Sequence, residues 1–196
     1  MKVVVVYAHP SHDSFARVVR DTATKVLSAG GHSVTLFSLY EEHFVAALSP
    51  EEWRAYTTDS PIIDPIVRRH ADAIVDADAL VFIYPTWWSG LPSILKGWCE
   101  RVLVLGVAFT FNDNAKVRPA LQNIKHIIGI STYGSPHSYI RLINDNGRRV
   151  ILRALRISTG RRTRTQWLGL YGIAQLTNSD RQAFLNRVEN KLSTLK

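Results

Sequence analysis

Runs of apolar residues alternate along the chain with segments in which apolar residues recur at helical spacing. The first run, Lys2–Tyr7, is a continuous β-branched stretch of the kind that is buried on both faces of a parallel sheet. Comparable runs follow, so that strands are predicted at residues 2–7, 32–39, 79–84, 126–131 and 165–171. Because strands and helical segments alternate, the pattern predicts an α/β fold in which a five-stranded parallel sheet carries helices on both faces.

The segments between the strands carry helix start and stop signals. After the first strand, Asp13 or Ser14 can cap a helix that ends at Gly30-Gly31. Further helices are predicted at residues 65–76, 92–105, 139–156 and 179–195, the last capped by Ser179 or Asp180. Residues 40–64 are less regular and form a candidate lid or dimer loop.

The composition fits one domain with one core. The chain has 196 residues, of which 46% are hydrophobic and 20% charged, so a single domain over residues 1–196 is expected. The longest apolar run is too short to span a bilayer and begins at Met1 without a basic leader, which favours a cytoplasmic protein. The chain has a single cysteine, Cys99, and no Cys/His spacing typical of a zinc site, so no metal is expected.

The formal net charge of +8 favours anionic partners, and much of the excess lies in one arginine cluster. Its members are Arg141, Arg148, Arg149, Arg153, Arg156, Arg161, Arg162 and Arg164. A solvated helix face is the simplest interpretation. A site for the 2′-phosphate of NADPH and a docking patch for an acidic lipid, protein or nucleic acid are the alternatives. No DNA- or RNA-binding motif supports a nucleic-acid partner, whereas a peripheral membrane partner stays open.

In a doubly wound sheet a ligand lies beyond the carboxyl ends of the strands, so the loops that follow the strands are the candidate sites. The first loop, Tyr7–Phe15, is rich in hydroxyl and imidazole groups and leads directly into a helix N-terminus. This arrangement indicates an anion site, although the same residues could simply cap a turn. The loop contains neither the P-loop pattern nor the dinucleotide-binding glycine pattern.

The loop after the third predicted strand, Tyr84–Pro92, contains two adjacent tryptophans between a proline and a glycine. Their faces could flank a planar ring while backbone amides point at its heteroatoms. The alternative is a hydrophobic plug or a subunit interface. The loop after the fourth strand, Ser131–Tyr139, offers hydroxyls and amides that could stabilise negative charge on a bound ring. His137 and Tyr139 are candidate acid/base groups there, unless they only pack at a helix start.

The most specific segment of the chain is Tyr84–Val102, which combines a proline, an aromatic pair, Gly-x-Pro and then Leu-Lys-Gly-Trp-x-Glu-Arg-Val. With the three loops it strongly resembles the NAD(P)H:quinone oxidoreductase family of flavodoxin-like proteins, which includes DT-diaphorase and the ancillary quinone reductases of bacterial potassium efflux systems. The resemblance runs from Val3 to about Ser138. It implies a flavodoxin-like fold with sheet order 2-1-3-4-5.

The resemblance also assigns residues to roles. Those implied to bind a flavin are His9, Ser14, Phe15, Pro85, Thr86, Trp87, Trp88, Ser89, Thr132, Tyr133, Gly134 and Tyr139. Phe109 and Phe111 would overhang the substrate side of the ring. Tyr139 and His137 are the candidate catalytic residues. Asp145 falls near the position where DT-diaphorase places its active-site histidine, so His137 is the candidate to substitute for that histidine.

The implied function is a flavin-dependent NAD(P)H oxidoreductase. It would transfer hydride from NADH or NADPH through flavin N5 to a quinone or similar small acceptor by a ping-pong mechanism. The short chain favours FMN over FAD, and the family's pockets imply a homodimer. A flavodoxin-type electron carrier and a flavin-bearing regulatory subunit of a transporter are the alternatives. The basic charge and the bulky aromatic loop argue against the carrier.

Overall fold

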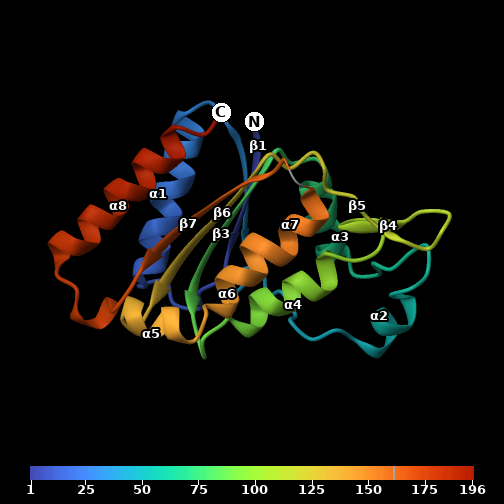
Figure 1. The fold of residues 1–196 in the computed structure, drawn as a ribbon, viewed down its shortest axis with the longest axis horizontal. Helices are drawn as coiled ribbons and strands as arrows, with labels where there is room; N and C mark the ends of the chain where they lie inside the picture. The colour runs from blue at the N-terminus through green and yellow to red at the C-terminus, as the bar shows by residue number, and fades with distance from the viewer. Residues whose placement is uncertain (161) are drawn as a thin grey trace.

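A computed structural model describes residues 1–160 and 162–196, so Arg161 of the arginine cluster lies outside the described residues. Its centre is a five-stranded parallel sheet with the order β2-β1-β3-β6-β7 (Figure 1). The five strands are β1 (Lys2–Tyr7), β2 (Ser33–Ser38), β3 (Ala79–Thr86), β6 (His126–Tyr133) and β7 (Arg164–Leu170). The predicted α/β fold and sheet order are confirmed.

The strand numbers differ from the predicted ones because a short antiparallel hairpin lies between the third and fourth strands of the sheet. It consists of β4 (Phe109–Phe111) and β5 (Val117–Pro119). The sequence pattern did not predict it, since three-residue strands are too short to show alternation.

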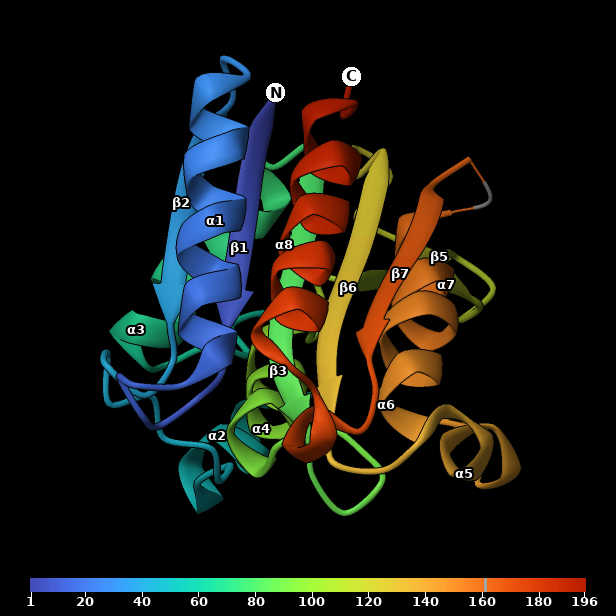
Figure 2. The ribbon, with the colours of Figure 1, turned by 90° about the vertical axis from the view of Figure 1, so that its left-hand side faces the viewer.

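Helices cover both faces of the sheet, which explains why its central strands are apolar throughout. Figure 2 shows α1 (Phe15–Ala29) and α8 (Asn178–Ser193) side by side on one face. The other face carries the remaining long helical segments, which are α3 (Pro65–Val75), α4 (Ser93–Val102), α6 (Asn146–Arg149), the π-helical turn η1 (Val150–Ala154) and α7 (Leu155–Thr159). Alternate residues of β1 enter the two cores, as Val3 and Val5 face α1 and α8 whereas Val4 and Val6 face the other layer.

Short helical segments complete the fold: α2 (Pro50–Ala55), α5 (His137–Leu142) and the 3-10 turn η2 (Ile173–Gln175). The cap predicted for α1 is confirmed at Ser14, whose side chain accepts a hydrogen bond from the Arg17 amide. The cap predicted for the last helix is wrong. Thr177 caps α8, because its hydroxyl and the Asp180 carboxylate satisfy each other's backbone amides in a capping box.

The single helix predicted over residues 139–156 is also wrong, because the chain leaves the helical path after α5. Asn144 and Asp145 have φ angles of 65° and 34°, in the left-handed region. Asp145 is buried there, where it accepts a hydrogen bond from the Tyr133 hydroxyl and caps α6 through the Arg148 amide. A tertiary hydrogen bond thus overrides the local helical periodicity.

The segment from residue 40 to 64 is fastened to α4 by Arg101. The Arg101 side chain is 4% exposed and forms ion pairs with Glu52 at 2.6 Å and with Asp64 at 2.7 Å. It also donates to the Val45 carbonyl. A Cβ at Gly97, one turn earlier, would collide with the Ala46 backbone. The motif Lys-Gly-Trp-x-Glu-Arg therefore holds this segment against the helix.

His70 makes a second buried link between this segment and the helices. Its ring is fully buried, stacks on Phe37 at 3.7 Å between centroids, and accepts a hydrogen bond from Trp98 Nε1 at 2.9 Å. Its Nε2 lies 3.0 Å from a Glu42 oxygen. Since Nδ1 is the acceptor for Trp98, the neutral ring carries its hydrogen on Nε2. Burial lowers the pKa of His70, and the Glu42 hydrogen bond only partly opposes this effect.

We expect Arg101→Met to destabilise the fold by about 3–5 kcal/mol, because removing the guanidinium leaves the buried Glu52 carboxylate without its partner. Urea denaturation of the variant and the parent measures this difference. Arg54→Met is the matched control, since Arg54 pairs with Glu51 on the surface, and should change stability by less than about 1 kcal/mol. Equal effects of the two substitutions would contradict the structural role of Arg101.

We expect His70 to make stability fall with decreasing pH. Because the folded pKa is lowered from its ordinary value of 6.5, the unfolded chain binds a proton that the folded protein does not. The stability contributed by neutral His70 is therefore complete above that value and is lost as the pH drops below it. Urea denaturation between about pH 8 and about pH 5 should show a smaller loss in His70→Gln than in the parent. An identical loss in both proteins would assign the pH dependence to other groups.

Candidate functional site

Three loops meet at the carboxyl edge of the sheet, where the strands β1, β3 and β6 end. The register of the two central strands pairs Pro85 with Thr132 and Thr86 with Tyr133, so their loops start at the same level. Thr86 Oγ1 and Ser131 Oγ lie 2.8 Å apart and join the two strand ends. The chain reverses its direction of winding between β1 and β3, which is the switch point at which flavodoxin-like sheets bind ligands.

A pocket of about 270 Å³ opens between the loops that follow β3 and β6. The lining residues are Thr86, Trp87, Trp88, Ser89, Tyr133, Gly134, Ser135, Tyr139 and Ile140. Seven of them were predicted from the sequence as cofactor-binding residues, whereas Ser135 and Ile140 were not singled out. None of these nine side chains carries a formal charge, so the pocket suits an aromatic, uncharged group.

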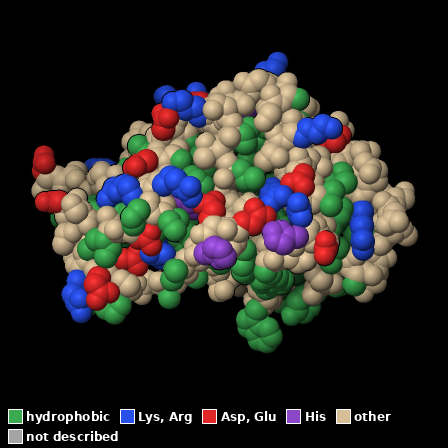
Figure 3. Space-filling model, turned by 180° about the vertical axis from the view of Figure 1, so that it is seen from behind, with side chains coloured by type: hydrophobic (Ala, Val, Ile, Leu, Met, Phe, Trp, Pro, Cys, Tyr) green, Lys and Arg blue, Asp and Glu red, His purple; other side chains and the backbone are tan. Residues whose placement is uncertain are grey.

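The aromatic wall of this pocket is a tight turn with an unfavourable backbone. Trp87 and Gly90 exchange backbone hydrogen bonds, and the two residues between them, Trp88 and Ser89, have φ angles of 47° and 60°. Glycine or asparagine is usual at such positions, so a tryptophan and a serine hold the turn at a conformational cost of about 1–3 kcal/mol each. Trp88 is fully exposed. Figure 3 shows hydrophobic side chains projecting from the lower edge of the molecule, toward which the strands run in Figure 1.

The loop after β1 reaches this pocket through His9, whose ring centroid lies 5.8 Å from that of Trp87. His9 Nδ1 accepts a hydrogen bond from the Ser11 amide, and burial lowers the pKa of the ring. Ser14 caps α1, and its hydroxyl lies 3.2 Å from the Tyr7 hydroxyl. The first amides of α1 have no acceptor within the helix, so this loop offers donors to an anion.

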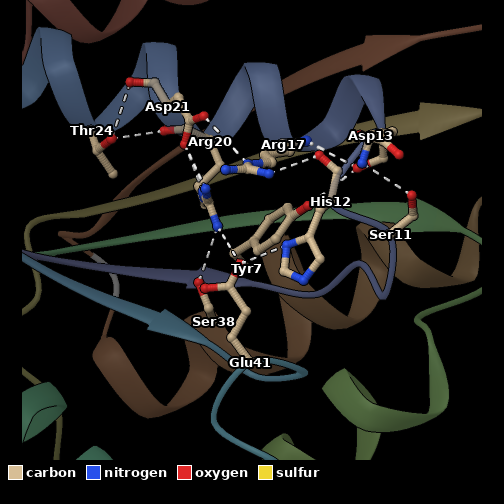
Figure 4. Close-up of polar contacts among 11 residues, drawn as sticks. Tyr7, Ser11, His12, Asp13, Arg17, Arg20, Asp21, Thr24, Ser38 and Glu41 are labelled. Atoms are coloured by element: carbon tan, nitrogen blue, oxygen red, sulfur yellow. Dashed lines mark hydrogen bonds and ion pairs between the residues drawn. The ribbon is translucent and has the colours of Figure 1, made fainter.

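The buried side chain of Arg20 contacts Tyr7 at the start of the same loop. Arg20 of α1 pairs with Glu41 at 2.9 Å and with Asp21 at 2.7 Å, and its guanidinium lies over the Tyr7 ring (Figure 4). The sequence analysis missed this residue because an arginine on an amphipathic helix is normally solvated. Only the tertiary position of Glu41, just beyond β2, reveals the pair.

Some predicted site residues lie elsewhere. Phe15 packs on Phe184 of α8, with ring centroids 6.3 Å apart, on the covered face of α1. Phe109 and Phe111 contact each other on the hairpin and do not line this pocket within the described part of one chain. Pro85 and Thr132 are buried in the strands, so they can face a ligand only through their backbone.

The two predicted catalytic residues both belong to α5, but their side chains line different pockets. Tyr139 is 47% exposed and lines the aromatic pocket. His137 instead packs edge-on against Tyr171 at 4.6 Å and lines a second pocket on the other side of α5.

Tyr133 lines the aromatic pocket and contacts two residues of the second pocket, Asp145 and Tyr171. It is buried, stacks on Tyr171 at 4.5 Å, and its hydroxyl donates to Asp145 at 2.7 Å. Burial and the Asp145 carboxylate raise the pKa of Tyr133 above its ordinary value. The hydroxyl therefore stays protonated and acts as a structural hydrogen-bond donor.

Neither a metal cluster nor a membrane-crossing helix emerges from the described residues. Across residues 1–160 and 162–196, no three His, Cys, Asp or Glu side chains are grouped so as to hold a metal ion. No helix within the same ranges combines the length and apolar character that crossing a membrane requires.

Residues 1–190 match the family described as "Flavodoxin-like fold", and the chain belongs to this family. The resemblance drawn from the proline and tryptophan segment is thereby confirmed.

The relatives within this family carry more specific names. The chain is 34% identical over 118 residues to an "Uncharacterized NAD(P)H oxidoreductase" of Haemophilus influenzae, covering 60% of this chain and 57% of that one. It is 30% identical over 153 residues to "NAD(P)H dehydrogenase [quinone] 1" of Rattus norvegicus, covering 70% and 56%. The chain thus spans little more than half the length of these curated relatives. The solved structure of an NAD(P)H:quinone oxidoreductase from Methanothermobacter marburgensis superposes with a TM-score of 0.82 at 29% identity, covering 100% of this chain and 99% of that one.

We expect Tyr133→Phe to lower the free energy of unfolding by about 1–3 kcal/mol, because the buried Asp145 carboxylate loses a hydrogen-bond donor. Tyr139→Phe is the matched control, since its hydroxyl lies on a half-exposed ring, and should be near neutral. Urea denaturation compares the two variants. A Tyr133→Phe protein as stable as the parent would show that the Tyr133–Asp145 bond contributes little to holding α6.

Proposed function

We propose that the protein is a flavin-dependent NAD(P)H oxidoreductase that reduces a quinone or a similar small acceptor. The observation that carries this proposal is the uncharged aromatic pocket beside a helix N-terminus at the sheet's switch point. The names of the curated relatives and of the Methanothermobacter structure support the reaction class.

The residues present fit a flavin. A planar ring needs an apolar face and a few polar contacts, which Trp87 and the amides near Gly134 can supply. A phosphate needs donors without internal partners, which the start of α1 and the Ser14 region can supply. FMN is the proposed flavin, with FAD as the alternative.

When bound, the flavin would accept hydride at N5 and pass two electrons to the acceptor. The protein's part is positioning and electrostatics. Trp87 and Tyr139 would fix the plane of the ring, and the amides of Tyr133 and Gly134 would stabilise negative charge at its edge. Tyr139 is the favoured proton donor because it lines the pocket. His137 is less favoured, since it packs against Tyr171 on the far side of α5. The nicotinamide and the acceptor would bind in turn at the same place, in a ping-pong order.

A homodimer would complete the pocket. Large apolar side chains are exposed along the segment 40–64, the aromatic turn and the hairpin, including Val45, Trp53, Trp88, Phe111 and Val117. Such residues are typical of an interface. Phe111, which stands away from the pocket of its own chain, could then cover the pocket of a second copy. We expect the dimer to work in the cytoplasm.

The test is an absorption spectrum of the purified protein, followed by anaerobic addition of NADH and, separately, NADPH. We expect flavin bands that bleach with at least one nucleotide and return on addition of a quinone. A colourless protein that binds neither FMN nor FAD would overturn the proposal.

A pair of tryptophan variants locates the flavin within this experiment. Trp87→Ala should weaken FMN affinity by about tenfold or more, since an aromatic contact contributes on the order of 1 kcal/mol beyond its buried area. Trp53→Ala removes an exposed tryptophan of α2 and should leave the FMN affinity of the protein unchanged at concentrations that maintain its oligomeric state. Equal affinities in both variants would move the flavin away from the Trp87 turn.

A further inference from the structure

A second pocket, of about 510 Å³, lies on the other side of α5 from the aromatic pocket. Its walls come from α5, α6, η1 and α7 on one side and from β7 and Tyr171 on the other. Five arginines line it, against a single carboxylate. These arginines are Arg141, Arg148, Arg149, Arg153 and Arg156.

The positive charge of this pocket is not neutralised by its own carboxylate. Asp145 is buried and engaged by the Tyr133 hydroxyl and the Arg148 amide. In the part of the chain that the structure describes, no ion pair joins Arg141, Arg149 or Arg153 to a carboxylate, although ion pairs form elsewhere on the surface. Like charges crowded into a concavity raise the local potential and attract anions more strongly than the same charges on a flat surface.

The local backbone gathers these side chains on one wall. Arg149 and Arg153 are four residues apart in the continuous segment of α6 and the π-helical turn η1, and Arg141 comes from the separate helix α5. Such single π-turns inside α-helices are frequent at functional sites. Arginines that lie on a simple solvated helix face would not require the π-helical turn η1 or a facing strand such as β7.

The rest of the lining limits what the anion can be. Ile140, Leu152 and Tyr171 supply an apolar side to the pocket. Guanidinium groups match the oxygens of phosphate bidentately, and the apolar side can hold the organic part of the ligand. A concave pocket also favours a small molecule over a membrane surface, which would need a flat or convex basic face.

We propose that this arginine pocket binds a phosphate-bearing small molecule at a site separate from the aromatic pocket. The phosphate can come from a free polyphosphate or from the 2′-phosphate of a dinucleotide. The site stands on its own residues and does not require the proposed flavin chemistry.

Isothermal titration calorimetry with inorganic pyrophosphate tests the proposal, on the full chain as purified, without added FMN and at constant ionic strength. We expect saturable binding to the parent protein. The double variant Arg149→Gln/Arg153→Gln should bind about tenfold or more weakly, because two charge-assisted contacts are lost. The matched control Lys25→Gln/Lys191→Gln removes two exposed charges from α1 and α8, on the opposite face of the sheet, and should bind as the parent does.

Titrations with NADP⁺ and NAD⁺ distinguish the two sources of phosphate. Tighter binding of NADP⁺ that disappears in the Arg149/Arg153 double variant supports the dinucleotide 2′-phosphate. Equal binding of the two dinucleotides, with pyrophosphate binding still lost in the double variant, supports a free polyphosphate. Absence of pyrophosphate binding to the parent, or equal binding by the double variant and its control, would overturn the proposal and leave a solvated arginine face. Circular dichroism of each variant checks that the fold is intact, and the readout remains usable even if the protein binds no flavin.

Discussion

The ion pairs of Arg101 with Glu52 and Asp64 connect helix α4, at the carboxyl edge of the sheet, to the segment 40–64 that packs against it. A guanidinium that is 4% exposed would destabilise the fold if it had no charged partner, and here both carboxylate partners come from residues 40–64. Phe44 and Ile62 of this irregular segment also enter the core, so the ion pairs act together with hydrophobic contacts to hold it. Since α4 begins directly after the tryptophan turn, the same helix fixes the turn on one side and this segment on the other. Motif residues that resemble a functional signature therefore act here through packing and ion pairing.

The parallel sheet determines which side chains from distant parts of the chain lie close together. Residues 9, 87 and 133 are far apart in the chain, and the common direction of β1, β3 and β6 delivers them to one edge. The hydroxyl pair of Thr86 and Ser131 locks two of the strand ends together. The position of the pocket is thus a property of topology, and its chemistry is a property of three short loops.

The elements that follow a simple period could be predicted from the sequence, including all five strands of the sheet and the cap at Ser14. The pocket could be predicted too, because its residues come directly after strands. The predictions that failed concern contacts between residues that are far apart in the sequence. Asp145 leaves the helical path because of a hydrogen bond to Tyr133, which no local pattern encodes. Arg20 is buried because Glu41 lies opposite it. His137 lies at the start of α5 and packs against Tyr171, beyond the end of β7, a contact that no local pattern encodes.

The left-handed turn at Trp88 and Ser89 has a consequence for engineering the molecule. A glycine or asparagine would relax the backbone at either position, so routine stabilisation of this fold would replace these residues early. Doing so would remove the exposed indole and flatten the rim of the aromatic pocket. Substitutions at Trp88 and Ser89 that raise the thermal stability of the protein would therefore also change the shape of the pocket rim.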